Sequence, residues 1–424
     1  MSECTTFSEW NALLSSISAE QPVFHIGPEP ASGTIDWSAA VEACLRSPIG
    51  ARPVSQMAES ASDAVILVDD ATRPTPQRKL LPPLLDTLER SGLPAANITV
   101  LIALGTHRYM TRSQIRERFG TSVARRVNVF NHTWRDPSCF TPLGSTASGV
   151  PLSVNRLAVE ADLIIGTGSI VPHIWAGWGG GAKIVLPGIS AADSIAPTHA
   201  LAEHEDDLRR VSGRAENACR QEIERAARRA GLDLILNCVV DADGRPIWIG
   251  AGDPVEAHRA GVAIARQVFV RDVPRRADIV LADARPATKD YWQGIKALAH
   301  AARGVREGGA VVLAGTFPEG VAPTHPQFRE HANRSVGEIR RAAETGEITD
   351  PVVVTTLCLH AMLRRQCRVI CLSPGLSEGE ASDLGFWHAR NAGDALHMAR
   401  ELTSPSGSVG LIDYAGDVLP AMTD

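Results

Sequence analysis

Apolar residues in this chain gather in short runs that end at polar or glycine-containing segments, a pattern typical of buried strands in an open α/β sheet. The first clear run is Ala64 to Val68, and a second spans Ile98 to Leu104. Segments with helical character follow them at Gln77 to Ser91 and at Gln114 to Phe119, with Thr111 as the N-cap of the latter. Strands that alternate with helices in this way predict a mainly parallel sheet.

The alternation of predicted strands and helices continues to the end of the chain. Further strands are predicted at 127–130, 151–154, 163–166, 277–282, 310–314, 368–372 and 408–412, and a hairpin at 232–240 and 246–250. Helices are predicted at 37–45, 254–268, 292–303, 351–365 and 392–402. Charged residues recur at helical spacing in a further segment, which predicts a solvated helix face formed by Glu216, Arg220, Glu224 and Arg228.

A shift in composition divides the chain at the short polar stretch Arg271 to Arg276. A new series of strands and helices begins directly after it. We therefore predict an α/β protein with two domains, residues 1–271 and a smaller domain of residues 272–424, each with a mainly parallel sheet. The active site is expected in the cleft between the two domains.

Composition excludes several classes of protein. The 424 residues are 44% hydrophobic and 21% charged, and the net charge of −6 comes without any dense basic tract, so nucleic acid is not an expected partner. No apolar run reaches membrane-spanning length, and the first residues lack the basic-then-apolar order of a secretory signal. The eight cysteines are scattered, without a Cys-x-x-Cys motif. We predict a cytoplasmic protein with no membrane partner.

One segment, from Gly166 to His199, concentrates candidate chemistry. It holds two histidines, two tryptophans, a Gly-Gly-Gly and one lysine, with almost no ordinary surface charge. Gly177 and Gly179 to Gly181 allow positive φ angles and the close approach of a bulky group. Lys183 lies among apolar residues, where a lysine is either a phosphate clamp or a nucleophile with a lowered pKa. A snorkelling lysine beside core histidines explains each residue singly but not all of them together, so we predict the active site here.

Three more polar clusters follow predicted strands, where open α/β sheets bind ligands. Asp70 and Arg73 follow the first strand; Arg73 either grips a carboxylate or phosphate in a bidentate contact or pairs with Asp70 at a loop surface. His107 follows the second strand and is a candidate for proton transfer or a structural histidine. In the second domain, Gln293 and Lys296 share a helix face and either reach into the cleft or form a solvated first turn.

Taken together, these clusters resemble the motifs of the nickel-dependent lactate racemase family. The resemblance rests on DDATRPTP at 69–76, GTHRYMT at 105–111, PHIWAGWGGGAK at 172–183, the later His199, and the Gln293 and Lys296 pair. It is strongest over residues 60 to 300. It implies a racemase or epimerase that inverts the C2 centre of a small 2-hydroxy acid by reversible hydride transfer. The implied cofactors are nickel and the nickel-pincer nucleotide, a pyridinium-3-thioamide-5-thiocarboxylic acid mononucleotide, loaded with the help of cofactor-synthesis enzymes.

The resemblance also assigns roles to individual residues. It implies that Lys183 forms the covalent bond to the cofactor, that His199 is the protein ligand to nickel, and that His107 and His173 transfer protons. Further cofactor contacts are implied for Asp70, Thr72, Gly180 and Gly181. Substrate contacts are implied for Arg73, Gln293, Lys296 and Trp292.

The sequence departs from lactate-specific members at Ile174-Trp175, Trp178-Gly179 and Trp292. The tryptophans are expected to line or shape the pocket, so a larger hydroxy acid than lactate, such as malate, an aromatic lactate or a sugar acid, is favoured. A cofactor-binding or storage protein of the same fold is the alternative. A nicotinamide dehydrogenase is disfavoured because no Gly-x-Gly-x-x-Gly follows an early strand.

Overall fold

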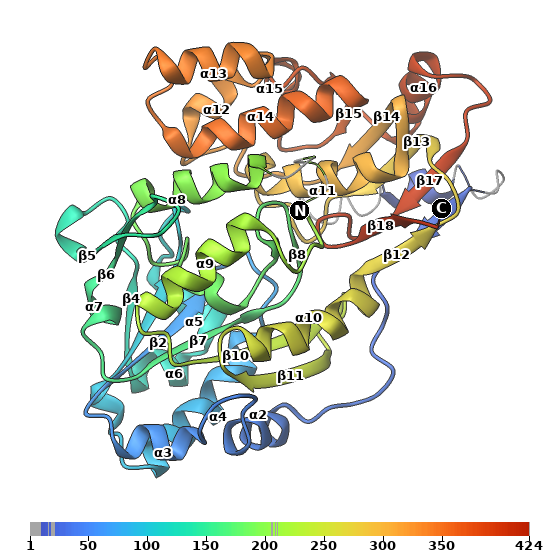
Figure 1. The fold of residues 1–424 in the computed structure, drawn as a ribbon. Helices are drawn as coiled ribbons and strands as arrows, with labels where there is room; N and C mark the ends of the chain where they lie inside the picture. The colour runs from blue at the N-terminus through green and yellow to red at the C-terminus, as the bar shows by residue number, and fades with distance from the viewer. Residues whose placement is uncertain are drawn as a thin grey trace.

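Two six-stranded sheets organise the protein (Figure 1). The computed structural model describes residues 10–15, 17, 22–204, 207, 209 and 211–423. The first sheet has the strand order β11-β10-β7-β2-β3-β4, and the second has the order β1-β17-β13-β14-β15-β16. Neighbouring strands are parallel throughout, except that β10 and β11 form an antiparallel hairpin. The predicted α/β class with mainly parallel sheets is thus confirmed.

The first sheet is built from the earlier part of the chain. Its strands are β2 (Ala64–Asp69), β3 (Ile98–Ala103), β4 (Asn128–Asn131), β7 (Ile164–Ser169), β10 (Leu234–Val240) and β11 (Pro246–Gly252). The accompanying helices are α2 (Trp37–Arg46), α3 (Val54–Glu59), α4 (Gln77–Arg90), α5 (Arg112–Phe119), α6 (Thr121–Arg126), α7 (Arg156–Val159), α8 (Ala192–Ala200), α9 (Ala218–Arg229) and α10 (Glu256–Phe269). Two small antiparallel pairs join β5 (Phe140–Ser145) to β6 (Pro151–Asn155) and β8 (Pro172–His173) to β9 (Gly177–Trp178).

The second sheet takes most of its strands from the later part of the chain. They are β1 (Phe24–Ile26), β13 (Ala277–Asp283), β14 (Val305–Ala314), β15 (Arg368–Leu372), β16 (Trp387–His388) and β17 (Val409–Ile412). Its helices are α11 (Tyr291–Gly304), α12 (Pro326–His331), α13 (Val336–Glu344), α14 (Pro351–Gln366), α15 (Glu378–Asp383) and α16 (Ala392–Leu402). A separate parallel pair joins β12 (Val270–Val273) to β18 (Leu419–Met422).

The strands read as continuous apolar runs because helices cover both faces of each sheet. In β2 all six residues are buried. Val65 and Leu67 face the large core that also contains α11 and α14 residues, whereas Ile66 and Val68 face a core formed with α2, α3 and α4. Alternate residues of a strand point to opposite faces, so a strand covered on both sides needs an apolar residue at every position.

The order of strands in the first sheet fixes where a ligand can bind. Strands β2, β3 and β4 follow one another towards one edge of the sheet, and strands β7, β10 and β11 follow one another towards the opposite edge. The direction of growth therefore reverses between β2 and β7. In open α/β sheets the crevice at the carboxyl ends of the two strands at such a switch point is the usual ligand site.

Most predicted elements are present within one or two residues, including the hairpin and the Thr111 cap of α5. Two differences stand out. The predicted strand at 151–154 pairs with β5 outside the main sheet. The early strand β1 was not predicted, and it joins the second sheet beside β17. The division near residue 272 remains a proposal. None of the helices in the described ranges is both long and apolar enough to cross a membrane.

The predicted solvated face of α9 is wrong at one position. Arg220 is fully buried, and its guanidinium donates hydrogen bonds to the carbonyl oxygens of Ala176 and Trp178. Glu222 on the same helix is also buried. The charge pattern along α9 resembles that of an exposed helix, but Arg220 is held inside by carbonyl groups from the distant glycine-rich segment.

Candidate active site

A single pocket collects the residues predicted from the strand-end motifs. It lies at the carboxyl ends of β2, β3 and β7 and is closed on the other side by α11 and α14. The predicted residues that line it are Asp70, Thr72, Arg73, His107, His173, Gly180, Gly181, Lys183, His199, Trp292, Gln293 and Lys296. Residues far apart in the sequence therefore meet at the crevice that the strand order predicts.

Asp70 and His107 form the first contact across neighbouring strands. His107 Nδ1 lies 2.8 Å from Asp70 Oδ2, and the Thr72 hydroxyl donates to Asp70 Oδ1 at 2.6 Å. Burial alone would raise the pKa of Asp70, but His107, Arg73 and these hydrogen bonds together lower it below its ordinary value. An ionised Asp70 accepts the Nδ1 proton of His107, which leaves a lone pair on Nε2 of His107.

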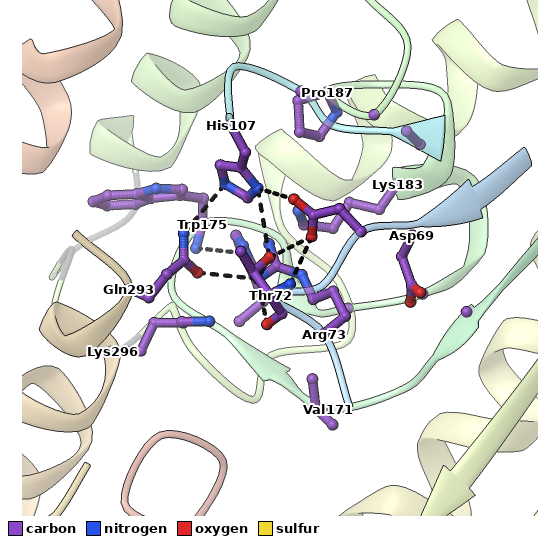
Figure 2. Close-up of a pocket in the computed structure, with 18 of the residues that line it drawn as sticks. Asp69, Thr72, Arg73, His107, Val171, Trp175, Lys183, Pro187, Gln293 and Lys296 are labelled. Atoms are coloured by element: carbon purple, nitrogen blue, oxygen red, sulfur yellow. Dashed lines mark hydrogen bonds and ion pairs between the residues drawn. The ribbon is translucent and has the colours of Figure 1, made fainter. Parts of the chain in front are cut away.

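Gln293 brings the second sheet's helix α11 to this pair (Figure 2). Its Nε2 lies 3.2 Å from His107 Nε2, and its Oε1 accepts a hydrogen bond from Arg73 at 3.1 Å. The amide thus donates to the lone pair of His107 and accepts from the guanidinium, which agrees with the tautomer assigned above. Arg73 donates to Gln293 and Thr72 rather than pairing with Asp70, and its remaining donors are available to a pocket ligand.

His173 has the opposite arrangement of its two ring nitrogens. The backbone N–H groups of Trp175 and Ala176 both donate to His173 Nδ1, each at 3.2 Å. The remaining proton of the neutral ring is therefore on Nε2. Burial, followed by the charges of Lys183 and Arg73, lowers the pKa of His173 well below its ordinary value, so the ring is neutral. His173 offers an N–H where His107 offers a lone pair.

Lys183 belongs to a short 3-10 helix, Gly181–Ile184, that packs against β7 and α9. Burial is the largest cause that lowers its pKa, and the positive charges of Arg73 and Arg220 lower it further. The pKa falls well below the ordinary value for lysine. A neutral amine in a pocket is a nucleophile, whereas an ammonium group is not.

The glycines before Lys183 permit a tight turn that only glycine tolerates. Gly180 and Gly181 have φ angles of 69° and 60°. A Cβ atom on Gly181 would lie 2.8 Å from the His258 ring, and one on Gly180 would lie 2.9 Å from Asn237 Oδ1. Of the glycines predicted to adopt positive φ angles, Gly177, Gly180 and Gly181 do so, whereas Gly179 does not.

A layer of buried polar groups fixes this turn from behind. Asn237 Oδ1 accepts the Gly181 N–H at 2.7 Å, and His258 Nε2 lies 2.9 Å from the Gly179 carbonyl oxygen. Arg220 holds the carbonyls of Ala176 and Trp178. Sequence reasoning missed these supports. Asn237, the one polar residue inside the apolar strand β10, is the only one of the three that carried a visible signal.

His199 lies in the last turn of α8, with its ring 6.0 Å from the Trp175 ring. Burial, then Lys183 and His325, lower the pKa of His199 to about 3, so its imidazole is neutral. Neutral imidazole is the form that binds metal ions. Within the described part of the chain, no three His, Cys, Asp or Glu side chains gather as a metal site. A metal at His199 would therefore need further ligands from a bound molecule.

Lys296 and Asp417 add an ionisable pair on the side of the second sheet. Burial and the nearby Arg73 lower the pKa of Lys296 to about 7, although Asp417 opposes this shift. Burial raises the pKa of Asp417 to about 6. Figure 2 shows Lys296 projecting from α11 beside Gln293, towards Arg73. Asp417 lies in the segment before β18, and no sequence motif identified it.

Of the three tryptophans predicted to line or shape the pocket, two line it and one lies in the core. Trp175 and Trp292 line the pocket, as predicted. Trp178 does not: it is fully buried and donates through its indole N–H to the Gly213 carbonyl. Trp178 therefore supports the glycine-rich segment from within the core.

Comparisons with known proteins identify relatives of the whole chain. The family described as "Lactate racemase N-terminal domain" matches residues 11–209. A lactate racemase from Thermoanaerobacterium thermosaccharolyticum is 31% identical over 382 residues, covering 88% of both chains. Another from Lactiplantibacillus plantarum is 32% identical over 64% of both.

Solved structures show the same fold. The lactate racemase apoprotein from Thermoanaerobacterium thermosaccharolyticum aligns with a TM-score of 0.83 at 25% identity, covering 94% of both chains. A protein from Thermotoga maritima aligns with a TM-score of 0.70 at 19% identity, covering 92% of this chain and 100% of its own.

Proposed function

Because this chain belongs to the lactate racemase family, we propose that it inverts the C2 centre of a small 2-hydroxy acid with a covalently bound nickel-pincer nucleotide. The relatives support a racemase, an isomerase, and the pocket supports the finer assignment. The observation that carries the proposal is that one pocket is lined by a lysine whose pKa is lowered well below its ordinary value, the neutral imidazole of His199, and His107 and His173 in opposite tautomers. Such a set goes beyond what a conventional acid–base enzyme needs.

The residues present fit this cofactor. The lowered pKa of Lys183 favours the neutral amine that a covalent amide-type bond requires, and Gly180 and Gly181 line the same pocket. His199 would provide one nitrogen ligand to the nickel, and the nucleotide would supply the remaining donors. When bound, the cofactor would supply an electrophilic acceptor for the C2 hydrogen.

The chain's own residues orient the substrate. We propose that Arg73 holds the substrate carboxylate through the guanidinium donors that Gln293 and Thr72 leave free. Lys296, which faces Arg73 in the pocket, adds a second positive charge. Fixing the carboxylate leaves C2 and its hydroxyl free to face the two histidines.

The two histidines move the hydroxyl proton. Nε2 of His107 can take it, because Asp70 holds the Nδ1 proton and stabilises the charge that forms on the ring. Nε2 of His173 carries a proton to give, and two backbone N–H groups at Nδ1 stabilise the negative charge left behind. One group with a lone pair and one with a proton is the starting state that a two-base racemase needs.

The proposal predicts that substrate labelled with deuterium at C2 gives inverted product that keeps the label. Holoprotein made with the cofactor-synthesis enzymes is assayed by chiral chromatography and mass spectrometry, with lactate, malate, phenyllactate and an aldonate as candidates. Loss of label to water in step with inversion contradicts hydride transfer. Full adduct without inversion of any hydroxy acid favours the alternative, a cofactor-binding or storage protein.

A second prediction concerns pH. The ammonium charge of Lys296 is lost as pH rises through about 7, rather than near the ordinary value for lysine. If this charge binds the carboxylate, kcat/KM should fall as pH rises above about 7, because kcat/KM reports the free enzyme. Lys296→Arg keeps its charge at every pH and should remove this fall. An unchanged pH profile in the arginine variant contradicts the role.

A further inference from the structure

His325 is a buried histidine that the proposed reaction does not use, and it lies between two indole rings. Its ring stacks on Trp292 at 4.6 Å and 29°, and on Trp134 at 6.4 Å and 28°. Trp292 belongs to α11, beside the second sheet, whereas Trp134 follows β4 of the first sheet. The side chain of His325 is only 2% exposed. The stack thus joins the two halves of the pocket.

Hydrogen bonds fix the ring of His325 within this stack. Its Nδ1 lies 2.6 Å from Asp350 Oδ2, and its Nε2 lies 2.9 Å from the Thr106 hydroxyl. A carboxylate can only accept, so Nδ1 donates to Asp350, and Nε2 shares the second hydrogen bond with the Thr106 hydroxyl. Asp350 also caps α14 through its other oxygen, which receives the Val352 N–H at 3.1 Å. Asp350 is thereby held in place by the helix that it begins.

The partners of His325 adjoin both members of the contact between His107 and Gln293. Thr106 immediately precedes His107, and Trp292 immediately precedes Gln293. In addition, the indole N–H of Trp134 donates to the carbonyl oxygen of His107 at 3.0 Å. His325 therefore contacts the backbone neighbours of the proton-transfer histidine on one side and of its amide partner on the other.

We propose that His325 is a positioning residue that keeps His107 aligned with Gln293 across the two sheets. The inference rests on the proposed function, since it assigns His325 a part in the same reaction. A displacement of about 1 Å at a reacting group can lower the rate by about 100-fold, so a rigid link at this point has a large effect on turnover. The nearby Arg108–Glu319 ion pair also connects the loop after β3 to the segment after β14. Because this pair is solvent-exposed, it contributes little to the alignment of His107 with Gln293.

Thr106→Val tests the proposal, because it removes the hydroxyl and keeps the shape of the side chain. We expect kcat to fall about tenfold or more, KM to change little, and the mass of the Lys183 adduct to stay unchanged. Thr106→Ser restores the hydroxyl and should restore kcat. His325→Phe, which keeps a ring between the indoles but no nitrogen, should behave as Thr106→Val does. Arg108→Ala is the control, because it removes a different contact between the same two parts of the protein and leaves His325 and Thr106 unchanged.

Hydrogen exchange on the apoprotein gives a readout that needs no activity. Thr106→Val should speed amide exchange in residues 104–111 and leave exchange in β2 unchanged. Unchanged exchange and unchanged kcat in Thr106→Val overturn the proposal, as does an equal fall of kcat in Arg108→Ala. If the wild-type holoprotein inverts no hydroxy acid, the proposed function fails, while the exchange result still decides whether His325 fixes the His107 loop.

Discussion

Lys183→Ala is expected to abolish both the covalent adduct and turnover. Burial and the neighbouring cations Arg73 and Arg220 lower the pKa of the Lys183 amine well below its ordinary value, which favours the nucleophilic neutral form. Alanine offers no nucleophile, so intact-mass spectrometry should show the unmodified chain after production with the cofactor-synthesis enzymes. Racemisation should fall to the background rate, since the C2 hydrogen has no acceptor. The variant should fold, because the substitution removes one amine from a cluster of positive groups.

Lys296→Ala is the matched control for that experiment. It removes the other pocket-lining lysine with a lowered pKa, yet it should keep the adduct and lose substrate affinity instead. An adduct of full mass on Lys183→Ala would contradict the assignment of the covalent bond. His199→Ala should keep the adduct and lose nickel, which metal analysis of the same preparations would show.

The sequence was most informative for strands that are buried on both faces, because such strands consist almost entirely of apolar residues. Strands β2 and β3 could be predicted because both faces of the sheet are covered, so their residues are nearly all buried and apolar. The carboxyl ends of these strands then mark the edge of the sheet where a ligand is expected to bind. The motif residues Asp70 and His107 follow these two neighbouring strands. Their contact is a direct consequence of parallel pairing, although the sequence alone does not show which strands are neighbours.

Other features could not be predicted, because they depend on contacts between distant segments. β1 is a strand of three residues that is defined by its pairing with β17, near the opposite end of the chain. Arg220 has the spacing of a surface residue, and only the carbonyls of the glycine-rich segment explain its burial. Asp417 and His325 belong to no motif, since each is recognised by what surrounds it in the folded protein.

His107→Ala and His173→Ala should each lower turnover in both directions by about 10²–10⁴-fold. Each inversion uses both rings, since one removes the hydroxyl proton and the other returns it. Rates from the D and the L substrate, measured separately, should therefore fall together. His132→Asn is a suitable control: His132 is buried and bonded to Asn155 and Ser190 outside the pocket, so its loss should affect stability more than turnover.

The two variants should differ in how they respond to added imidazole. In His107→Ala the vacated space lies beside Asp70, which can bind imidazole in the orientation that His107 has, so part of the activity should return. In His173→Ala the ring position lies deep in the pocket, against the N–H groups of Trp175 and Ala176, and rescue should be weaker because the site is only 8% exposed. Near-normal activity in either alanine variant would show that its histidine is structural, and the two-base scheme would then be wrong.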